Sequence, residues 1–66
     1  MDYIVSFEYS ETVCCANWVT TDDPKMIEEH YGKKYKWYDY HEATTGEVET
    51  ARMKGMPHRT YVGKGN

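Results

Sequence analysis

Apolar and polar side chains alternate near the start of the chain in a pattern typical of two half-buried β-strands. Over residues 3–9 the large apolar side chains fall at every second position, at Tyr3, Val5, Phe7 and Tyr9. Residues 12–20 are rich in Val, Cys, Trp and Thr, a composition that favours a second strand. A period of two places alternate side chains on one buried face. We therefore expect an N-terminal hairpin over residues 3–20.

The register of this hairpin depends on its turn. We expect a two-residue turn at Ser10 and Glu11, which sets the pairing of the two strands. The pairs that follow from this turn are Phe7–Cys14, Val5–Ala16 and Tyr3–Trp18. In this register the predicted buried face of the hairpin holds Val5, Phe7 and Trp18.

A short helix at 24–31 has the clearest start and stop signals in the chain. Asp23 can cap the helix, Pro24 suits its first position and Gly32 ends it. One predicted face carries Met26, Ile27, His30 and Tyr31. The other face carries Lys25, Glu28 and Glu29. We expect the first face to be buried and the charged face to meet water.

Residues 34–42 predict a third strand with contacts on both sides. One face would carry Tyr35, Trp37, Asp39 and His41. The other face would carry Lys34, Lys36, Tyr38 and Tyr40. Since neither set is purely apolar, both faces are expected to make contacts. A last short strand is predicted at 58–62, followed by a frayed tail at 63–66.

The segment 44–55 fits either a helix or a hairpin. As a helix, it would begin with a capping box of Thr44 and Glu47 and end at Gly55. As a hairpin, it would turn at Thr45 and Gly46. Both interpretations remain open on the sequence alone.

These elements together predict a small single α+β domain over residues 1–62, with a mainly antiparallel sheet. The 66-residue chain contains no leucine, so aromatic rings must supply much of its core: Phe7, Trp18, Trp37 and some of the seven tyrosines. Either these rings pack well or a second copy completes the core, because so small a domain has little apolar surface to bury. We favour the second alternative, a homodimer.

Charge and targeting signals narrow the class of protein. The net charge is −3, but residues 1–32 hold seven acids and one base (−6), whereas residues 33–66 hold seven bases and four acids (+3). A strongly basic nucleic-acid-binding protein is therefore excluded, while a local basic patch is not. The sequence has no long apolar segment and no signal-peptide pattern, and its two cysteines are adjacent. We expect a cytoplasmic protein with no membrane partner.

The spacing of the reactive side chains matches no common metal or catalytic motif. Three histidines and two cysteines form no Cys-x-x-Cys and no His-x-x-x-His pattern. A phosphate-binding loop and a nucleophile elbow are also absent. We therefore expect a protein that is not an enzyme, with no catalytic residue, no metal site and no cofactor. A metal-binding or enzymatic protein is the third and least favoured alternative.

The segment from Lys33 to His41 interleaves basic and aromatic side chains. The candidate binding residues are Lys34, Lys36, Tyr38 and Tyr40, which share one side of the predicted strand. The alternation alone does not say whether these rings lie in the core or on the surface.

Two functions follow from this segment. The interpretation we favour is a small non-enzymatic protein that binds a protein partner and itself, in the manner of phage or mobile-element modulators and inhibitors, because exposed tyrosines suit an interface. The alternative is a module for single-stranded RNA or DNA, because cations follow phosphates while rings stack on bases.

Overall fold

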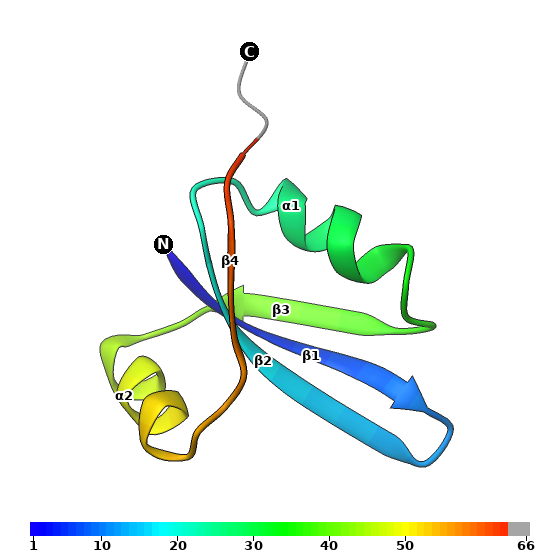
Figure 1. Ribbon diagram of the computed structural model, residues 1–66, viewed down its shortest axis with the longest axis horizontal. Coiled ribbons are helices and arrows are strands. Elements are labelled where there is room, and N and C mark those ends of the chain that lie inside the picture. Colours follow the sequence, from blue (N-terminus) through cyan, green and yellow to red (C-terminus); the bar gives the residue numbers. More distant parts are fainter. Residues whose placement is uncertain (64–66) are drawn as a thin grey trace.

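A computed structural model describes residues 1–63 as a four-stranded mixed sheet with helices (Figure 1). The elements in chain order are β1 (Asp2–Ser10), β2 (Val13–Thr21), α1 (Lys25–Ile27), η1 (Glu28–Gly32), β3 (Tyr38–Glu42), α2 (Thr45–Met53) and β4 (His58–Tyr61). The sheet order is β3-β1-β2-β4. β1 is antiparallel to β2 and β3, and β4 is parallel to β2. The predicted α+β class and the mainly antiparallel sheet are confirmed.

The predicted hairpin is present, but its predicted register is wrong by one residue. Phe7 pairs with Cys15, Val5 with Asn17 and Tyr3 with Val19. The chain turns at Glu11 and Thr12, and a bulge shifts the register between Glu8 and Ser10. A slip of one residue exchanges the two faces of a strand. Trp18 therefore lies on the sheet face opposite Phe7.

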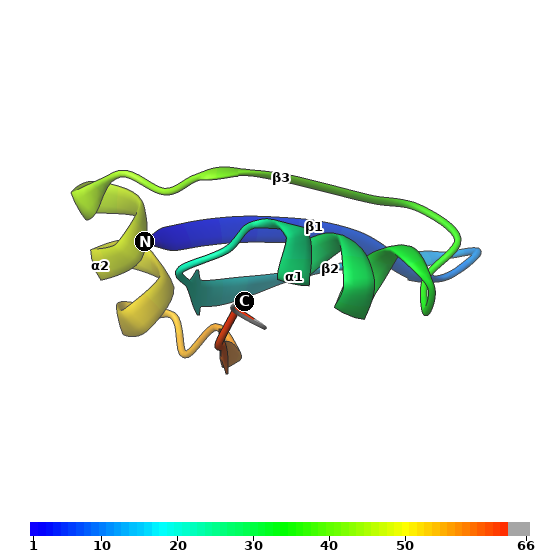
Figure 2. The same ribbon diagram turned by 90° about the horizontal axis from the view of Figure 1, so that it is seen from above.

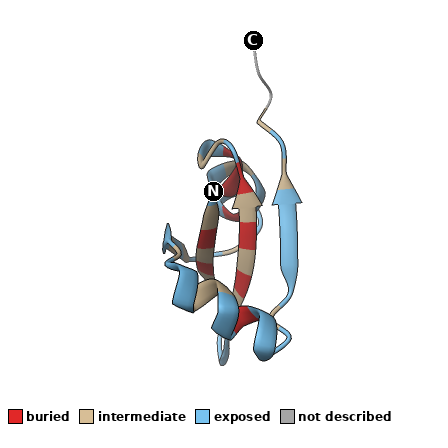
Figure 3. Cartoon of the chain, turned by 90° about the vertical axis from the view of Figure 1, so that its left-hand side faces the viewer, coloured by how far each residue is buried: buried red, intermediate tan, exposed pale blue. Residues whose placement is uncertain are grey.

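The core lies between one face of the sheet and the α1–η1 segment. Tyr3, Val5, Phe7 and Val19 from the sheet pack with Ile27 and Tyr31 from α1 and η1. Branched side chains thus share the core with rings, whereas Trp37 is exposed and Trp18 only half-buried. Figure 3 shows the buried positions on the two central strands, with the β4 edge exposed.

The predicted helix at 24–31 is confirmed in its position and refined in its form. Asp23 Oδ1 accepts a hydrogen bond from the N–H of Lys25 at 3.0 Å, and the single α-turn of α1 continues into the π-turn of η1. Beyond η1, the carbonyl of Tyr31 accepts from the N–H groups of Lys34 and Tyr35 at 3.3 and 3.0 Å. These bonds keep residues 33–36 in turns. The third strand therefore begins at Tyr38 instead of residue 34.

The helical interpretation of 44–55 is confirmed and the hairpin is wrong. Thr44 Oγ1 accepts from the N–H of Glu47 at 3.2 Å, and Glu47 Oε1 accepts from the N–H of Thr44 at 3.0 Å. Gly55 ends the helix region with a φ of 70°, a left-handed conformation that glycine adopts without strain. α2 lies near the start of β1 (Figures 1 and 2).

The described part of the chain ends at Gly63. Gly63 is held in place, because its N–H donates to Asp22 Oδ1 at 2.7 Å. The remainder of the predicted tail, residues 64–66, lies outside the described residues. Within residues 1–63, no helix has the length and apolar character needed to cross a membrane.

Candidate functional site

Tyr38 and Tyr40 form a half-buried pair on the β3 flank of the core. Their rings are parallel within 7°, with centroids 6.5 Å apart, and Tyr40 meets Tyr3 edge to face at 5.8 Å. Desolvation, together with the carboxylate of Glu28, raises the pKa of Tyr38. These rings pack against the core and remain partly exposed to solvent.

Lys34 lies on the opposite flank of the helix. It lines a hollow with residues of β2 and β4, whereas β3 is the other edge of the sheet. Lys36 is exposed in the turn before β3. The four predicted site residues therefore do not form one surface, because residues 33–36 leave η1 as turns and not as a strand.

Two adjoining hollows form a groove between the η1 helix with its following turn and the strands β1, β2 and β4. Figures 1 and 2 show β4 passing beside this helix. The smaller hollow, which we call the cationic pocket, has a volume of about 150 Å³ and is lined by Asn17, His30, Tyr31, Lys34, Tyr35, Arg59 and Tyr61. The larger, the aromatic hollow, has a volume of about 460 Å³ and is lined by Phe7, Tyr9, Cys15, Ala16, Asn17, Tyr35, Pro57 and Arg59. Asn17, Tyr35 and Arg59 line both hollows, which makes the groove continuous.

The groove contains cations that no acid neutralises. Among residues 1–63 the one ion pair is His41–Glu47, so Lys34 and Arg59 have no acidic partner there. No aspartate or glutamate lines either hollow, although the chain contains 11 acids and 8 lysines and arginines. The groove is therefore a positively charged site on an acidic protein.

Two buried polar groups line the cationic pocket. Asn17 Nδ2 donates to Tyr31 Oη at 2.8 Å, and these residues are only 8% and 2% exposed. Burial, with a further contribution from the hydroxyl of Tyr61, raises the pKa of Tyr31 to about 12. The Tyr31 hydroxyl thus stays neutral at physiological pH and adds no negative charge to the pocket.

Stacked rings join the helix and β4 at this pocket. His30 of η1 and Tyr61 of β4 stack with ring centroids 4.0 Å apart and planes within 11°. Tyr31 meets Tyr61 edge to face at 6.4 Å. Lys34 Nζ lies 5.7 Å from the centroid of the Tyr35 ring, within the range of a cation–π contact.

Sequence reasoning identified Lys34 and missed the rest of the groove. His30 was predicted on the buried face of its helix, but the structure leaves it exposed, with its ring stacked on Tyr61. Arg59 and Tyr61 belong to a short, mostly exposed strand. No local signal could indicate that this strand pairs in parallel with β2 beside the helix.

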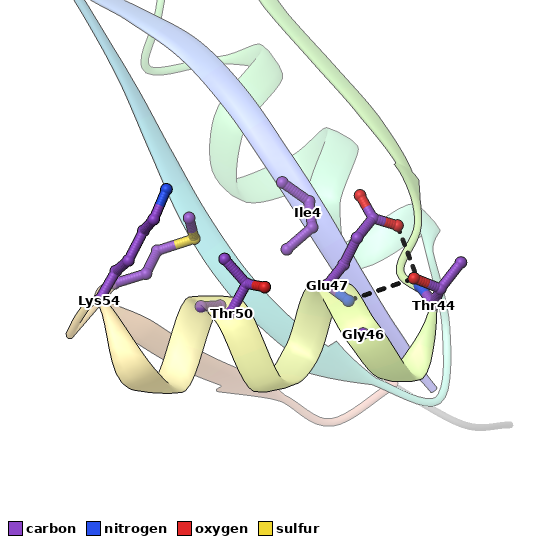
Figure 4. Close-up of a pocket in the computed structure, with 8 residues that line it drawn as sticks. Ile4, Thr44, Gly46, Glu47, Thr50 and Lys54 are labelled. Atoms are coloured by element: carbon purple, nitrogen blue, oxygen red, sulfur yellow. Dashed lines mark hydrogen bonds between the residues drawn. The ribbon is translucent and has the colours of Figure 1, made fainter.

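A third hollow, of about 460 Å³, lies between α2 and the other sheet face, against Ile4 (Figure 4). Lys54 stands at one end of α2 and Glu47 at the other. The charges there are mixed, and Glu47 already accepts from Thr44 and lies 2.6 Å from His41 Nε2. This hollow consequently has no preference for one sign of charge.

Similarity does not assign a function to this geometry. No protein-family model, curated protein or solved structure matches the chain. Within the described part of the chain, no group of three His, Cys, Asp or Glu side chains is placed to hold a metal ion.

Proposed function

We propose that this chain is a small non-enzymatic binding module that takes single-stranded nucleic acid into the groove between η1 and β4. One observation carries the proposal. Lys34 and Arg59, which have no acidic partner among residues 1–63, lie together with aromatic side chains in a groove that no aspartate or glutamate lines. Single strands are bound by this combination, because cations follow the phosphates while ring faces stack on exposed bases.

The two hollows suit different parts of a nucleic-acid strand. The cationic pocket offers positive charge and neutral hydrogen-bonding groups, which suit a phosphate. The aromatic hollow offers the larger volume and the exposed ring of Tyr9 beside the half-buried Tyr35, which suit a base. The two free cysteines, Cys14 and Cys15, suit a reducing compartment, so we place the module in the cytoplasm.

Salt dependence sets the scale of the expected binding. Each phosphate contact on a single strand contributes a slope of about −0.7 in log K against log salt. Two groove cations should therefore give a slope of about −1.4. Because the net charge of the protein is −3, we expect no further contribution to this slope from its overall charge.

The test is a titration of fluorescent oligo(dT) and oligo(U) with the purified chain, followed by anisotropy at several salt concentrations. Lys34→Gln and Arg59→Gln should each weaken binding and lower the slope by about one contact. Lys36→Gln and Arg52→Gln are the matched controls, since they remove the same charges from positions that do not line the groove. Equal losses in a groove variant and its control would contradict the assignment.

A second candidate, a protein partner, has one observation in its favour. Tyr9, Val13 and Trp37 are exposed apolar side chains near the tip of the hairpin, where the N–H of Glu8 donates to the carbonyl of Trp37 at 2.9 Å. Exposed aromatic residues of this kind are common interface anchors. The partner we consider is a second copy of the chain. In the wider class of this function, the chain would act as a modulator or inhibitor of a larger protein assembly.

The outer edge of β3 is a poorer place for such a copy to add a strand. The bonds of Glu8 to Trp37 and of Ala43 to Asp2 fix the alternation that turns the N–H of Tyr40 outward. That N–H already donates to Asp39 Oδ1 at 2.9 Å. An incoming strand would have to displace this carboxylate, so the hairpin tip is the better contact.

A further inference from the structure

We infer that the cationic pocket binds the terminal phosphate monoester of a nucleic-acid strand, while the adjoining nucleotide occupies the aromatic hollow. This inference rests on the proposed function and makes it more specific: the protein would recognise the end of a strand.

The two walls of the groove meet at the cationic pocket. His30 and Tyr61 come from η1 and β4 and stack at 4.0 Å, which joins the two walls of the groove. The pocket adjoins the aromatic hollow through the shared residues Asn17, Tyr35 and Arg59. A phosphodiester within a strand needs a path for the chain on both sides, whereas a terminal monoester needs only one.

The charge of the pocket also favours a terminal phosphate. A phosphate monoester carries about −1.5 to −2 at pH 7, more than the single charge of an internal diester. Lys34 and Arg59 supply two positive charges with no acidic partner among residues 1–63. Arg59 is also able to donate in parallel to two phosphate oxygens. The ligand that matches the pocket's charge is therefore the monoester.

The volume of the cationic pocket, about 150 Å³, corresponds to about five water-sized groups at roughly 30 Å³ each, which is comparable to the heavy atoms of one phosphate group. The neighbouring hollow, with about 460 Å³, offers the larger space and the Tyr35 ring at the junction. The same arrangement favours a nucleotide over a phosphorylated peptide, because the hollow next to the phosphate pocket is lined by aromatic side chains, of which Tyr9 is exposed.

The experiment compares one labelled tetranucleotide in three forms: with a 5′-phosphate, with a 3′-phosphate and with hydroxyl groups at both ends. A phosphoserine peptide and inorganic phosphate serve as additional probes. We expect one phosphorylated end to bind about 10-fold more tightly than the hydroxyl form, the gain expected from an added charge-assisted contact. Lys34→Gln and Arg59→Gln should remove this gain, and Arg52→Gln should preserve it. Arg59→Lys should retain part of it, because the charge remains without the bidentate geometry.

The outcomes separate the inference from the proposed function. Equal binding of all three oligonucleotides would overturn the inference and leave single-strand binding intact. Binding of inorganic phosphate without binding of any oligonucleotide would overturn both, and so would preference for the phosphoserine peptide. The circular dichroism spectra and melting temperatures of the Lys34 and Arg59 variants should match those of the wild type, since both residues are exposed.

Discussion

Replacement of Phe7 tests both the core and the observed register of the hairpin. The side chain is 5% exposed and lies between two rings, with centroids 5.4 Å from Tyr31 and 4.3 Å from Tyr35. Truncation of a buried Phe to Ala costs about 3–5 kcal/mol. A domain of this size rarely has more than about 3–5 kcal/mol of stability in total. Phe7→Ala should therefore be largely unfolded at room temperature.

A graded variant keeps this prediction measurable. Phe7→Leu retains most of the apolar volume and loses the two ring contacts, which should cost about 1–2 kcal/mol. A loss of 1 kcal/mol corresponds to a melting temperature lower by about 4–8 °C in a domain of this length. Urea unfolding followed by circular dichroism gives the free energy directly, provided that the slope with denaturant is unchanged.

Trp18→Ala is the comparison that separates the two registers. The pairing expected from the sequence would bury Trp18 beside Phe7, so that both truncations would cost alike. The observed pairing places Trp18 on the other face, where it stacks on His58 at 3.9 Å and donates to Asp2 Oδ1 at 3.1 Å. Loss of these contacts should cost only about 1–2 kcal/mol. The observed register would be refuted if Trp18→Ala destabilised as much as Phe7→Ala, or if Phe7→Ala melted within a few degrees of the wild type.

Two further predictions concern acid stability and self-association. Hydrogen bonds from Thr20 and Trp18 lower the pKa of Asp2, so their stabilisation is complete above the ordinary Asp pKa of about 3.9 and is lost as the pH falls through the lower folded value. Asp2→Asn should flatten the fall in melting temperature below about pH 5, and an unchanged acid profile would contradict this role. Tyr9, Val13 and Trp37 are exposed apolar side chains near the hairpin tip and suit contact with a second copy of the chain, so we expect a dimer in sedimentation at high concentration. Trp37→Ala should shift it to monomer, and a wild-type monomer with a melting temperature independent of concentration would exclude self-association.

The sequence determined those features whose deciding interactions are local. The alternation of Tyr3, Val5 and Phe7 predicted one buried face of β1, and all three are buried. Asp23 and Pro24 marked the start of the helix because the capping contact spans only two residues. The capping box of Thr44 and Glu47 was also readable, although the sequence left a turn at Gly46 equally open.

The basic and aromatic composition of residues 33–41 is evident in the sequence. The backbone conformation that decides where these side chains point is not. An alternating pattern places side chains on two faces only if the backbone is extended. Two N–H groups donating to the Tyr31 carbonyl keep Lys34 and Tyr35 in a turn. Lys34 therefore points to the groove, while Tyr38 remains against the core.

Only the tertiary structure decided the register of the hairpin and the composition of the groove. A bulge between Glu8 and Ser10 exchanged the faces of β2 and so placed Asn17 in the lining of the cationic pocket. The parallel pairing of β4 with β2 brought Arg59 and Tyr61 beside His30 and Lys34. These contacts join segments far apart in the chain, and the choice among possible strand partners depends on the burial and hydrogen bonding of the whole sheet. No window of neighbouring residues contains that information.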